Sequence, residues 1–175
     1  MQFNLEQESL KISASKIKLL ALDVDGVLTD GRLYFSNSGE ETKAFHSLDG
    51  HGIKMLLSAG VDVGIITGRT SLLVEKRAKD LGIEIIYQGR EDKLKALNEI
   101  VANKGYPLEE VAYVGDDLPD LPAIQSVGLG FSVPNGHSDV RAAAAAVTLT
   151  AGGSGAVREI TDFIIKSQNR NDNFT

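Results

Sequence analysis

Short apolar runs alternate with helical patterns along the chain from residue 17 onward. Six runs have the length and β-branched composition of buried strands, at residues 18–24, 61–67, 83–88, 111–116, 128–133 and 146–150. Between them, apolar residues recur every three or four positions, as they do in amphipathic helices. This alternation is typical of βαβ units and predicts a doubly wound, Rossmann-like α/β fold with a mainly parallel sheet.

The clearest of the predicted helices covers residues 91–105, where Gly105 is suited to the C-terminal turn. The apolar residues of its inner face are Leu94, Leu97, Ile100 and Val101. A second helix is predicted over residues 52–60 from the same spacing. The alanine-rich run 141–147 consists of good helix formers and predicts a third packed helix rather than a linker.

Residues 31–46 interrupt the alternation of strands and helices. They contain two short strand patterns around a Ser-Asn-Ser-Gly turn, which predict a β-hairpin projecting from the loop after the first strand. The hairpin is too apolar to be left fully solvated, and exposed strand edges favour pairing with another chain. The apolar residues concerned are Leu33, Tyr34, Phe35, Ala44 and Phe45.

The chain has 175 residues, which fits one domain of ordinary size. We expect a single core over about residues 17–165, with terminal extensions at 1–16 and 167–175. The last residues are polar and are expected to fray.

Composition narrows the class of protein. Hydrophobic residues make up 42% of the chain, but no run approaches the roughly 18 apolar residues of a membrane span. The N-terminal segment carries acidic residues and lacks an apolar signal core, which predicts a cytoplasmic location. The absence of cysteine excludes disulfides, thiolate nucleophiles and Cys-ligated zinc. With a net charge of −6 and no basic stripe, we expect neither a nucleic-acid partner nor a membrane partner.

Two carboxylates, Asp23 and Asp25, lie at the carboxyl end of the first predicted strand, directly before Gly26. In open α/β sheets this edge is where ligands bind. Residues two apart on a strand point to the same side, so both carboxylates can face one site. Ionised carboxylates in one cleft repel each other, and their hard oxygen atoms make Mg²⁺ the natural ion to hold them together.

Three later segments supply matching groups. Thr67, at a strand end, can bind phosphoryl oxygens through its hydroxyl and its N–H. Lys93 begins a helix, where its ammonium group can neutralise charge on a transferring group. Asp116 and Asp117, followed by Asp120, end another strand and can provide metal ligands and the partners that orient them. Each of these residues alone could be a turn former, a helix cap or a solvated surface residue, so the inference depends on their joint order.

The order Asp-x-Asp, Thr, Lys, Gly-Asp-Asp resembles the four motifs of the haloacid dehalogenase superfamily of phosphatases. Longer stretches, among them DVDGVLTDG, GEETKAF and VAYVGDDLPDLP, are similar to the subfamily of 3-deoxy-D-manno-octulosonate (KDO) 8-phosphate phosphatases. The resemblance covers about residues 17–165. It implies a Mg²⁺-dependent phosphatase that releases phosphate and the free sugar acid from KDO 8-phosphate in lipopolysaccharide precursor synthesis.

The resemblance also implies a role for each motif residue. Asp23 would attack phosphorus and form an aspartyl phosphate, while Asp25 would protonate the departing sugar oxygen and later activate water. Thr67 and Lys93 would complete the catalytic set. The metal ligands would be Asp23, the backbone carbonyl of Asp25, and Asp116.

A substrate that carries a carboxylate as well as a phosphate needs additional cations. Arg69 can form a bidentate pair with a carboxylate, and Arg77 lies two helical turns later on a similar face. The resemblance adds further substrate-binding residues, namely Asp25, His46, Ser47, Leu48, Asp49, Gly50, Lys54 and Lys93. Position 54 departs from the subfamily pattern, because Lys keeps the charge of the usual Arg but loses its planar fork.

The spacing of the motifs leaves no room for a separate cap domain. Only 44 positions separate Asp23 from Thr67, and 26 separate Thr67 from Lys93. An open cleft excludes water poorly, so a neighbouring subunit is the simplest cover. In the similar phosphatases the hairpin builds a homotetramer with active sites at subunit boundaries, and the resemblance implies the same assembly here.

Three other functions are compatible with parts of this pattern. A nine-carbon sugar acid 9-phosphate is the rival substrate within the phosphatase class. A receiver-like signalling domain also uses clustered strand-end Asp residues, a Thr and a Lys, although it needs no acid/base such as Asp25. A noncatalytic partner protein would not need the complete set of motif residues that this chain retains.

Overall fold

The structure is a computed structural model that describes residues 1–168. Residues 169–175, which include most of the tail expected to fray, lie outside the described residues. The strands are β1 (Gln2–Phe3), β2 (Leu19–Leu22), β3 (Tyr34–Phe35), β4 (Glu41–Thr42), β5 (Asp62–Ile66), β6 (Ile85–Tyr87), β7 (Val111–Val114), β8 (Leu129–Ser132) and β9 (Ala146–Val147). The α-helices are α1 (Gln7–Ser15), α2 (Ser47–Ser58), α3 (Leu72–Leu81), α4 (Lys93–Lys104), α5 (Leu121–Ser126), α6 (Ser138–Ala143) and α7 (Ala156–Ser167). Two short 3₁₀ helices, η1 (Leu108–Glu110) and η2 (Leu118–Asp120), precede β7 and α5.

A seven-stranded sheet forms the centre of the molecule, in the order β1-β9-β8-β7-β2-β5-β6. All neighbouring strands run parallel except β1, which pairs antiparallel with β9. The chain builds outward from β2 through β5 and β6, then returns to the other side of β2 for β7, β8 and β9. The direction therefore reverses between β2 and β7, which is the switch point where doubly wound folds bind ligands. This architecture confirms the predicted fold class.

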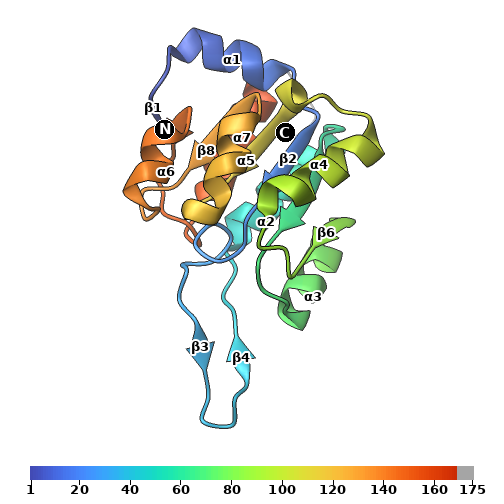
Figure 1. The fold of residues 1–175 in the computed structure, drawn as a ribbon, viewed down its shortest axis with the longest axis vertical. Coiled ribbons are helices and arrows are strands. Elements are labelled where there is room, and N and C mark those ends of the chain that lie inside the picture. Colours follow the sequence, from blue (N-terminus) through green and yellow to red (C-terminus); the bar gives the residue numbers. More distant parts are fainter. Residues whose placement is uncertain (169–175) are drawn as a thin grey trace.

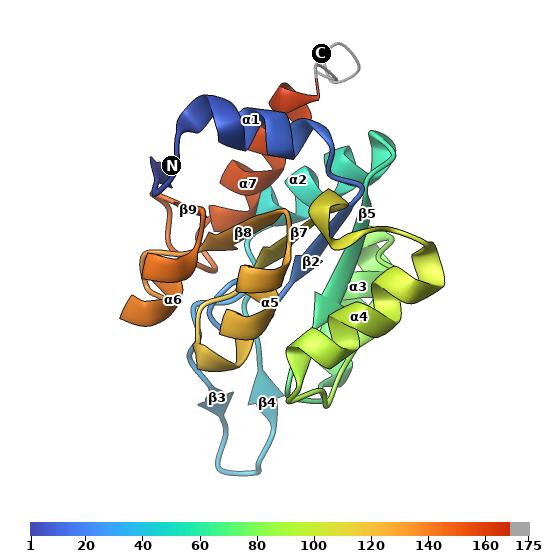
Figure 2. The same ribbon diagram turned by 45° about the horizontal axis from the view of Figure 1, so that its top comes forward.

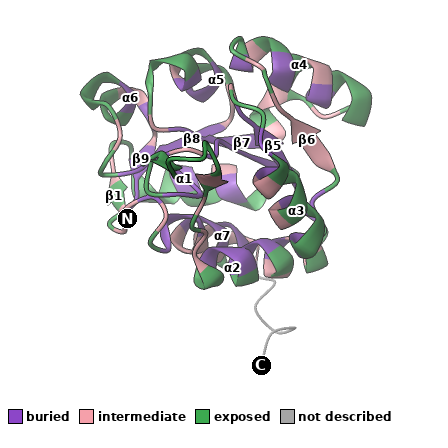
Figure 3. Cartoon of the chain, turned by 90° about the horizontal axis from the view of Figure 1, so that it is seen from below, coloured by how far each residue is buried: buried purple, intermediate pink, exposed green. Residues whose placement is uncertain are grey.

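Helices cover both faces of the sheet (Figure 3). On one face, α1, α2, α3 and α7 bury a core that includes Leu10, Ile53, Val74 and Ile160. On the other face, α4, α5 and α6 bury a second core that includes Leu97, Ile124 and Val140. Alternate residues of β2 point into the two cores, which explains why this strand is apolar throughout.

The predicted hairpin is present as the two-stranded sheet β3-β4, which projects from the body below the carboxyl ends of the central strands (Figures 1 and 2). Its turn is closed by Gly39, whose φ of 83° suits glycine. The side chains of Leu33, Tyr34 and Phe35 are exposed on it. The elements between β2 and β6 are this hairpin, α2, β5 and α3. This stretch of the described residues therefore contains no separate cap domain, as the motif spacing predicted.

The prediction of a helix across residues 141–147 is wrong in its second half. Helix α6 ends at Ala143, and Ala146 and Val147 form strand β9, which lies within the strand predicted over residues 146–150. Ala146 and Val147 are buried, and they pair with Phe131 and Ser132 of β8. Burial of β9 and its pairing with both β1 and β8 therefore outweigh the intrinsic helix preference of alanine.

The N-terminal segment is packed against the body. Strand β1 pairs with β9, and α1 lies across α7, with Leu10 and Ala14 buried (Figure 2). The division into a core and terminal extensions stays a prediction. Among residues 1–168, no helix combines the length and the apolar composition that a membrane span requires.

Candidate active site

The site begins at the switch point between β2 and β7. The two strands are paired so that Leu22 lies beside Val114, and the N–H of Asp23 donates to the carbonyl of Val114 over 3.0 Å. Asp23 follows β2 directly, and Asp116 comes two residues after β7. Parallel pairing of two strands thus brings together acids that are 93 positions apart in the chain.

Lys93 lies in the middle of a buried charge cluster. Its Nζ atom is 2.9 Å from Oδ1 of Asp23 and 2.7 Å from Oδ1 of Asp120. The hydroxyl of Tyr113 also donates to Oδ1 of Asp120, over 2.7 Å. Asp23 is only 5% exposed and Asp120 is fully buried. The first residue of α4 therefore places its ammonium group beside Asp23, the nucleophile predicted from the sequence.

Asp120 holds the loop that carries Asp116 in place through hydrogen bonds to its backbone. Its Oδ2 atom accepts the N–H groups of Asp116 and Asp117 over 3.2 Å each, while its Oδ1 atom is used by Lys93 and Tyr113. Asp117 instead caps the following turn by accepting the N–H of Leu118. Both oxygens of Asp120 thus have donors, and the carboxylate of Asp116 is left to face the site.

The cluster carries more negative than positive charge. Carboxylate oxygens of Asp23, Asp116 and Asp120 lie within 4.8 Å of one another, against the single ammonium group of Lys93. Burial, helped by the charge of Asp120, raises the pKa of Asp23 well above its usual value, although Lys93 acts in the opposite direction. Burial and the charge of Asp120 likewise raise the pKa of Asp116 to about 6. Burial lowers the pKa of Lys93, but the charges of Asp23 and Asp120 outweigh it and raise that pKa.

This donor set fits a divalent cation. Two acids whose ionised forms are disfavoured by burial and by like charge would be stabilised by a hard ion with an oxygen preference. Asp23 and Asp116 are the residues that could hold Mg²⁺, because Asp120 is already saturated by its four donors.

Gly26 allows the loop after β2 and the loop that carries Asp116 to approach each other. Its φ is 95°, and a Cβ atom at this position would lie 2.0 Å from Oδ2 of Asp116. Any side chain would therefore displace the carboxylate. This explains why the Asp-x-Asp pair is followed by glycine.

A cleft of about 350 Å³ opens above the cluster. Its lining residues are Asp23, Asp25, Gly31, Leu33, Thr67, Gly68, Arg69, Glu91, Lys93, Asp116, Asp117 and Pro119. Thr67 is buried at the end of β5, where its Oγ1 atom accepts the N–H of Arg69 over 3.3 Å. Its hydroxyl proton stays available for an oxygen of a ligand. The structure thus brings together all five residues predicted to catalyse the reaction or bind metal.

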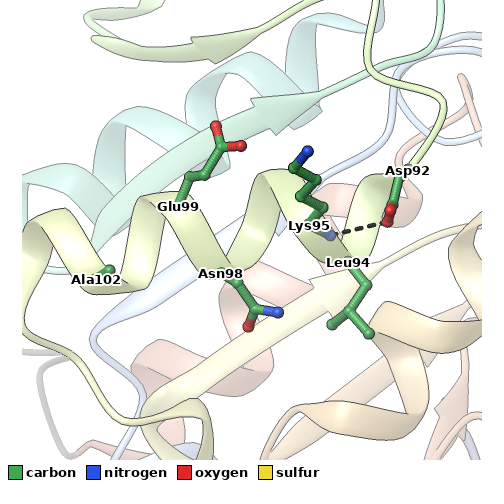
Figure 4. A pocket seen from close by; sticks show the side chains of 6 residues that line it. All are labelled: Asp92, Leu94, Lys95, Asn98, Glu99 and Ala102. Carbon is green, nitrogen blue, oxygen red and sulfur yellow. Dashed lines mark hydrogen bonds between the residues drawn. The ribbon is translucent and has the colours of Figure 1, made fainter.

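A second hollow, of about 500 Å³, lies along α4 and contains none of the motif residues (Figure 4). All of its lining residues belong to this one helix and its cap, Asp92, whose carboxylate accepts the N–H of Lys95. It therefore lacks groups that converge from different elements, as a catalytic site requires.

This chain is similar to known proteins in both sequence and structure. A family model for haloacid dehalogenase-like hydrolases matches residues 83–160. The KDO 8-phosphate phosphatase KdsC of Yersinia pestis is 48% identical over 157 residues, which is 90% of this chain and 84% of that protein. KdsC of Escherichia coli K12 is 47% identical over 91% of this chain and 85% of its own length. The chain belongs to the KdsC family of haloacid dehalogenase-like hydrolases.

The likeness to this family extends to the whole fold. A crystal structure of KDO 8-phosphate phosphatase from Moraxella catarrhalis, in complex with magnesium, phosphate and KDO, superposes with a TM-score of 0.95. Its sequence is 47% identical, and the match covers 97% of each chain.

Seven of the residues predicted to bind substrate do not line the cleft of the single chain. They are His46, Ser47, Leu48, Asp49, Gly50, Lys54 and Arg77. His46 caps α2 by accepting the N–H of Leu48, and Lys54 borders a different surface hollow beside the end of α3. Arg77 packs against this segment, with its guanidinium 5.8 Å from the ring centre of Phe45. Their part in substrate binding stays a prediction.

Asp49 has a structural partner of its own. It is 1% exposed, and its Oδ1 atom accepts the N–H of Arg158 over 2.7 Å, at the start of α7. Burial raises its pKa despite this bond. The carboxylate thus serves α7 as a cap, a role that the sequence pattern did not indicate.

Lys43 and Glu41 were not among the residues predicted for the site, yet both form ion pairs with residues that line the cleft. Lys43 forms an ion pair with Asp25, and Glu41 forms one with Arg69 at 2.8 Å. Glu41 also accepts the hydroxyl of Ser71 over 2.9 Å. The signal for them was present in the GEETKAF stretch, but strand alternation alone does not show which of its charges point toward the site.

Proposed function

We propose that this chain is a Mg²⁺-dependent phosphatase that hydrolyses KDO 8-phosphate to KDO and inorganic phosphate. The observation that carries the proposal is the cluster of buried Asp23 and Lys93 with half-buried Asp116, in an open cleft that Asp25 and Arg69 also line. Membership of the KdsC family, and likeness to an enzyme crystallised with magnesium, phosphate and KDO, supply the substrate.

The chain's residues divide the reaction into two steps. In the first, an oxygen of Asp23 attacks phosphorus, the bond from phosphorus to the sugar oxygen breaks, and Asp25 gives that oxygen a proton. In the second, Asp25 takes a proton from water, which attacks the aspartyl phosphate and releases inorganic phosphate. Lys93 and the hydroxyl of Thr67 stabilise the phosphoryl oxygens during both steps. Bound Mg²⁺ neutralises the charge that would otherwise keep the phosphate from the carboxylates.

The substrate's identity is tested by comparing kcat/KM on three compounds. These are KDO 8-phosphate, a nine-carbon sugar acid 9-phosphate, and glycerol phosphate as a simple ester. We expect KDO 8-phosphate to have the highest value, and a higher value on the nine-carbon acid would overturn the assignment. Release of one equivalent of the free sugar acid without release of phosphate would instead indicate a receiver-like domain that keeps its phosphoryl group.

Arg69 is our candidate for binding the substrate carboxylate, because it lines the cleft and 41% of its side chain is exposed. We expect Arg69→Ala to raise KM for KDO 8-phosphate at least tenfold, the order expected for a lost charge-assisted bond. The KM for glycerol phosphate, which has no carboxylate, should change less than threefold. Equal effects on both esters would move Arg69 out of carboxylate recognition.

We further propose that the protein is a homo-oligomer, by family likeness a tetramer, whose clefts lie at subunit boundaries. The support is the exposed apolar hairpin beside an uncapped cleft. Such a boundary would also give the predicted substrate-binding residues outside the cleft a place in the site.

Replacing two apolar residues of the hairpin tests this assembly. We expect Leu33→Ser with Phe35→Ser to shift the protein to smaller species in sedimentation velocity, because the exposed apolar surface that favours association is lost. The matched control is Ile12→Ser with Leu149→Ser, two exposed apolar residues outside the hairpin. An unchanged mass for the hairpin variant, or dissociation by the control alone, would refute the hairpin's role.

The cytoplasmic location and the role in lipopolysaccharide precursor synthesis go with this function. A sugar acid with both phosphate and carboxylate groups does not cross a membrane unaided, so the enzyme must share the compartment where its substrate is made. Cell fractionation tests the location.

A further inference from the structure

Four charged side chains form a closed ring at the root of the hairpin. Lys43 places its Nζ atom 2.5 Å from Oδ1 of Asp25 and 3.4 Å from Oε1 of Glu41. Arg69 places Nη2 2.8 Å from the same oxygen of Glu41, and Nε 3.7 Å from Oδ2 of Asp25. Each oxygen of the Asp25 carboxylate therefore faces its own cation.

Lys43 is the buried member of this ring. Its side chain is 2% exposed, whereas residues 31–40 of the same hairpin are all exposed. A lysine is rarely buried unless it is paired, and the two ion-pair partners of Lys43 are Asp25 and Glu41. The fold thus brings a cation from the hairpin directly to the proposed acid/base.

Arg69 and Lys43 have different surroundings, which separates their roles. Arg69 is partly exposed, and its contact with Asp25 is long at 3.7 Å, so this contact can be exchanged for one with a ligand. Lys43 is covered, so its contact with Asp25 can persist when Arg69 turns to the substrate carboxylate. Glu41 fixes the position of Lys43 because its other oxygen is held by Ser71 at the start of α3.

We propose that Lys43 is a positioning residue that holds the Asp25 carboxylate in the orientation needed for proton transfer. This inference rests on the role proposed above for Asp25 as acid and base. It makes the root of the hairpin part of the catalytic apparatus, in addition to any role of its tip in assembly.

The test compares Lys43→Met, which keeps the length and loses the charge, with Lys43→Arg, which keeps the charge. We expect Lys43→Met to lower kcat on KDO 8-phosphate about 100-fold, the lower range of general acid/base contributions, with KM changed less than threefold. Lys43→Arg should recover at least a tenth of the wild-type kcat. The control is Lys104→Met, which removes a more exposed lysine–aspartate ion pair, to Asp62 at the amino end of β5, and should leave kcat unchanged.

The choice of leaving group separates positioning from a general structural effect. In single-turnover reactions, glycerol phosphate needs a proton on its departing alkoxide, whereas p-nitrophenyl phosphate does not. We expect Lys43→Met to slow release of glycerol about 100-fold and release of p-nitrophenolate less than tenfold. Equal slowing of both would overturn the proposal, because a distorted nucleophile would affect both esters alike.

A double-mutant cycle supplies the second test. In an Asp25→Asn background, Lys43→Met should slow glycerol release by less than threefold, because Lys43 acts through Asp25. A further 100-fold loss in that background would refute this dependence. Thermal unfolding accompanies each variant, and if Lys43→Met does not fold, Lys43→Gln replaces it in both tests.

The substrate proposal can fail without this inference failing. Wild-type protein that cleaves glycerol phosphate but not KDO 8-phosphate would refute the proposed substrate, while the comparison of leaving groups would still decide the role of Lys43.

Discussion

Asp23→Asn is expected to lower kcat by at least about four orders of magnitude, the scale seen when a covalent nucleophile is removed. The amide has no charge with which to attack phosphorus, and Lys93 remains held by Asp120 at 2.7 Å, so the site should otherwise keep its shape. Phosphate release in saturating Mg²⁺ measures the loss. Trapping with radiolabelled substrate should give a phosphoprotein from the wild type and none from the variant.

The variant should remain folded, which separates chemistry from stability. Because burial and the charge of Asp120 disfavour the ionised form of Asp23, a neutral amide should leave the melting temperature of the metal-free protein unchanged or higher. The matched control is Asp139→Asn, on the exposed surface of α6, which should keep wild-type activity. A folded Asp23→Asn protein with activity within tenfold of wild type would contradict the nucleophile assignment.

Removal of Mg²⁺ is expected to abolish turnover, and added Mg²⁺ to restore it. With chelator present, the carboxylates of Asp23 and Asp116 would repel both each other and the incoming phosphate. Binding should also stabilise the fold: at a concentration 100-fold above its dissociation constant, Mg²⁺ contributes about 2.7 kcal/mol. For a chain of this size that corresponds to a rise of roughly 5–10 °C in melting temperature. Undiminished activity in chelator would refute the proposed chemistry.

The stabilisation by Mg²⁺ should increase with pH. The pKa of Asp116 is raised from 3.8 to about 6, so between these values the folded, metal-free protein binds more protons than the unfolded chain. Its stability therefore falls as pH rises through this window, and the cause is ionisation of a carboxylate in an already negative cluster. Mg²⁺ binds the ionised form, so the shift in melting temperature should be larger at pH 8 than at pH 5. Asp116→Asn should reduce this difference without abolishing it, because burial also raises the pKa of Asp23. A wild-type shift that is the same at both pH values would contradict the prediction.

Strand positions were predictable because buried parallel strands are marked by local composition. For example, the apolar run that starts at Val111 is followed by a Gly-Asp-Asp sequence. The structure has strand β7 at this run and the loop that carries Asp116 directly after it. For residues 141–147 the local signals conflicted, because the helix predicted there overlapped the strand predicted over residues 146–150. The alanines of this run favour a helix locally, and pairing with β8 makes part of it a strand.

The motif residues were predictable because each lies at the end of a strand or the start of a helix that the sequence itself defines. Lys93 begins the clearest helix, and Thr67 ends an apolar strand. The partners of the acid/base were not predictable. Lys43 is 18 positions from Asp25, on an exposed hairpin whose route back to the cleft depends on how the loop packs.

Local spacing along the chain was enough to predict the alternation of strands and helices and the set of groups that meet at the carboxyl edge of the sheet. The order of those groups indicated phosphoryl transfer through a family resemblance. The meeting of these groups follows from the rule that parallel strands end at one edge. Only the tertiary structure decided which carboxylate has both oxygens occupied by donors, as Asp120 has, and which cation faces Asp25. Such pairings depend on burial and on contacts between distant segments, and neither is encoded in the spacing of residues along the chain.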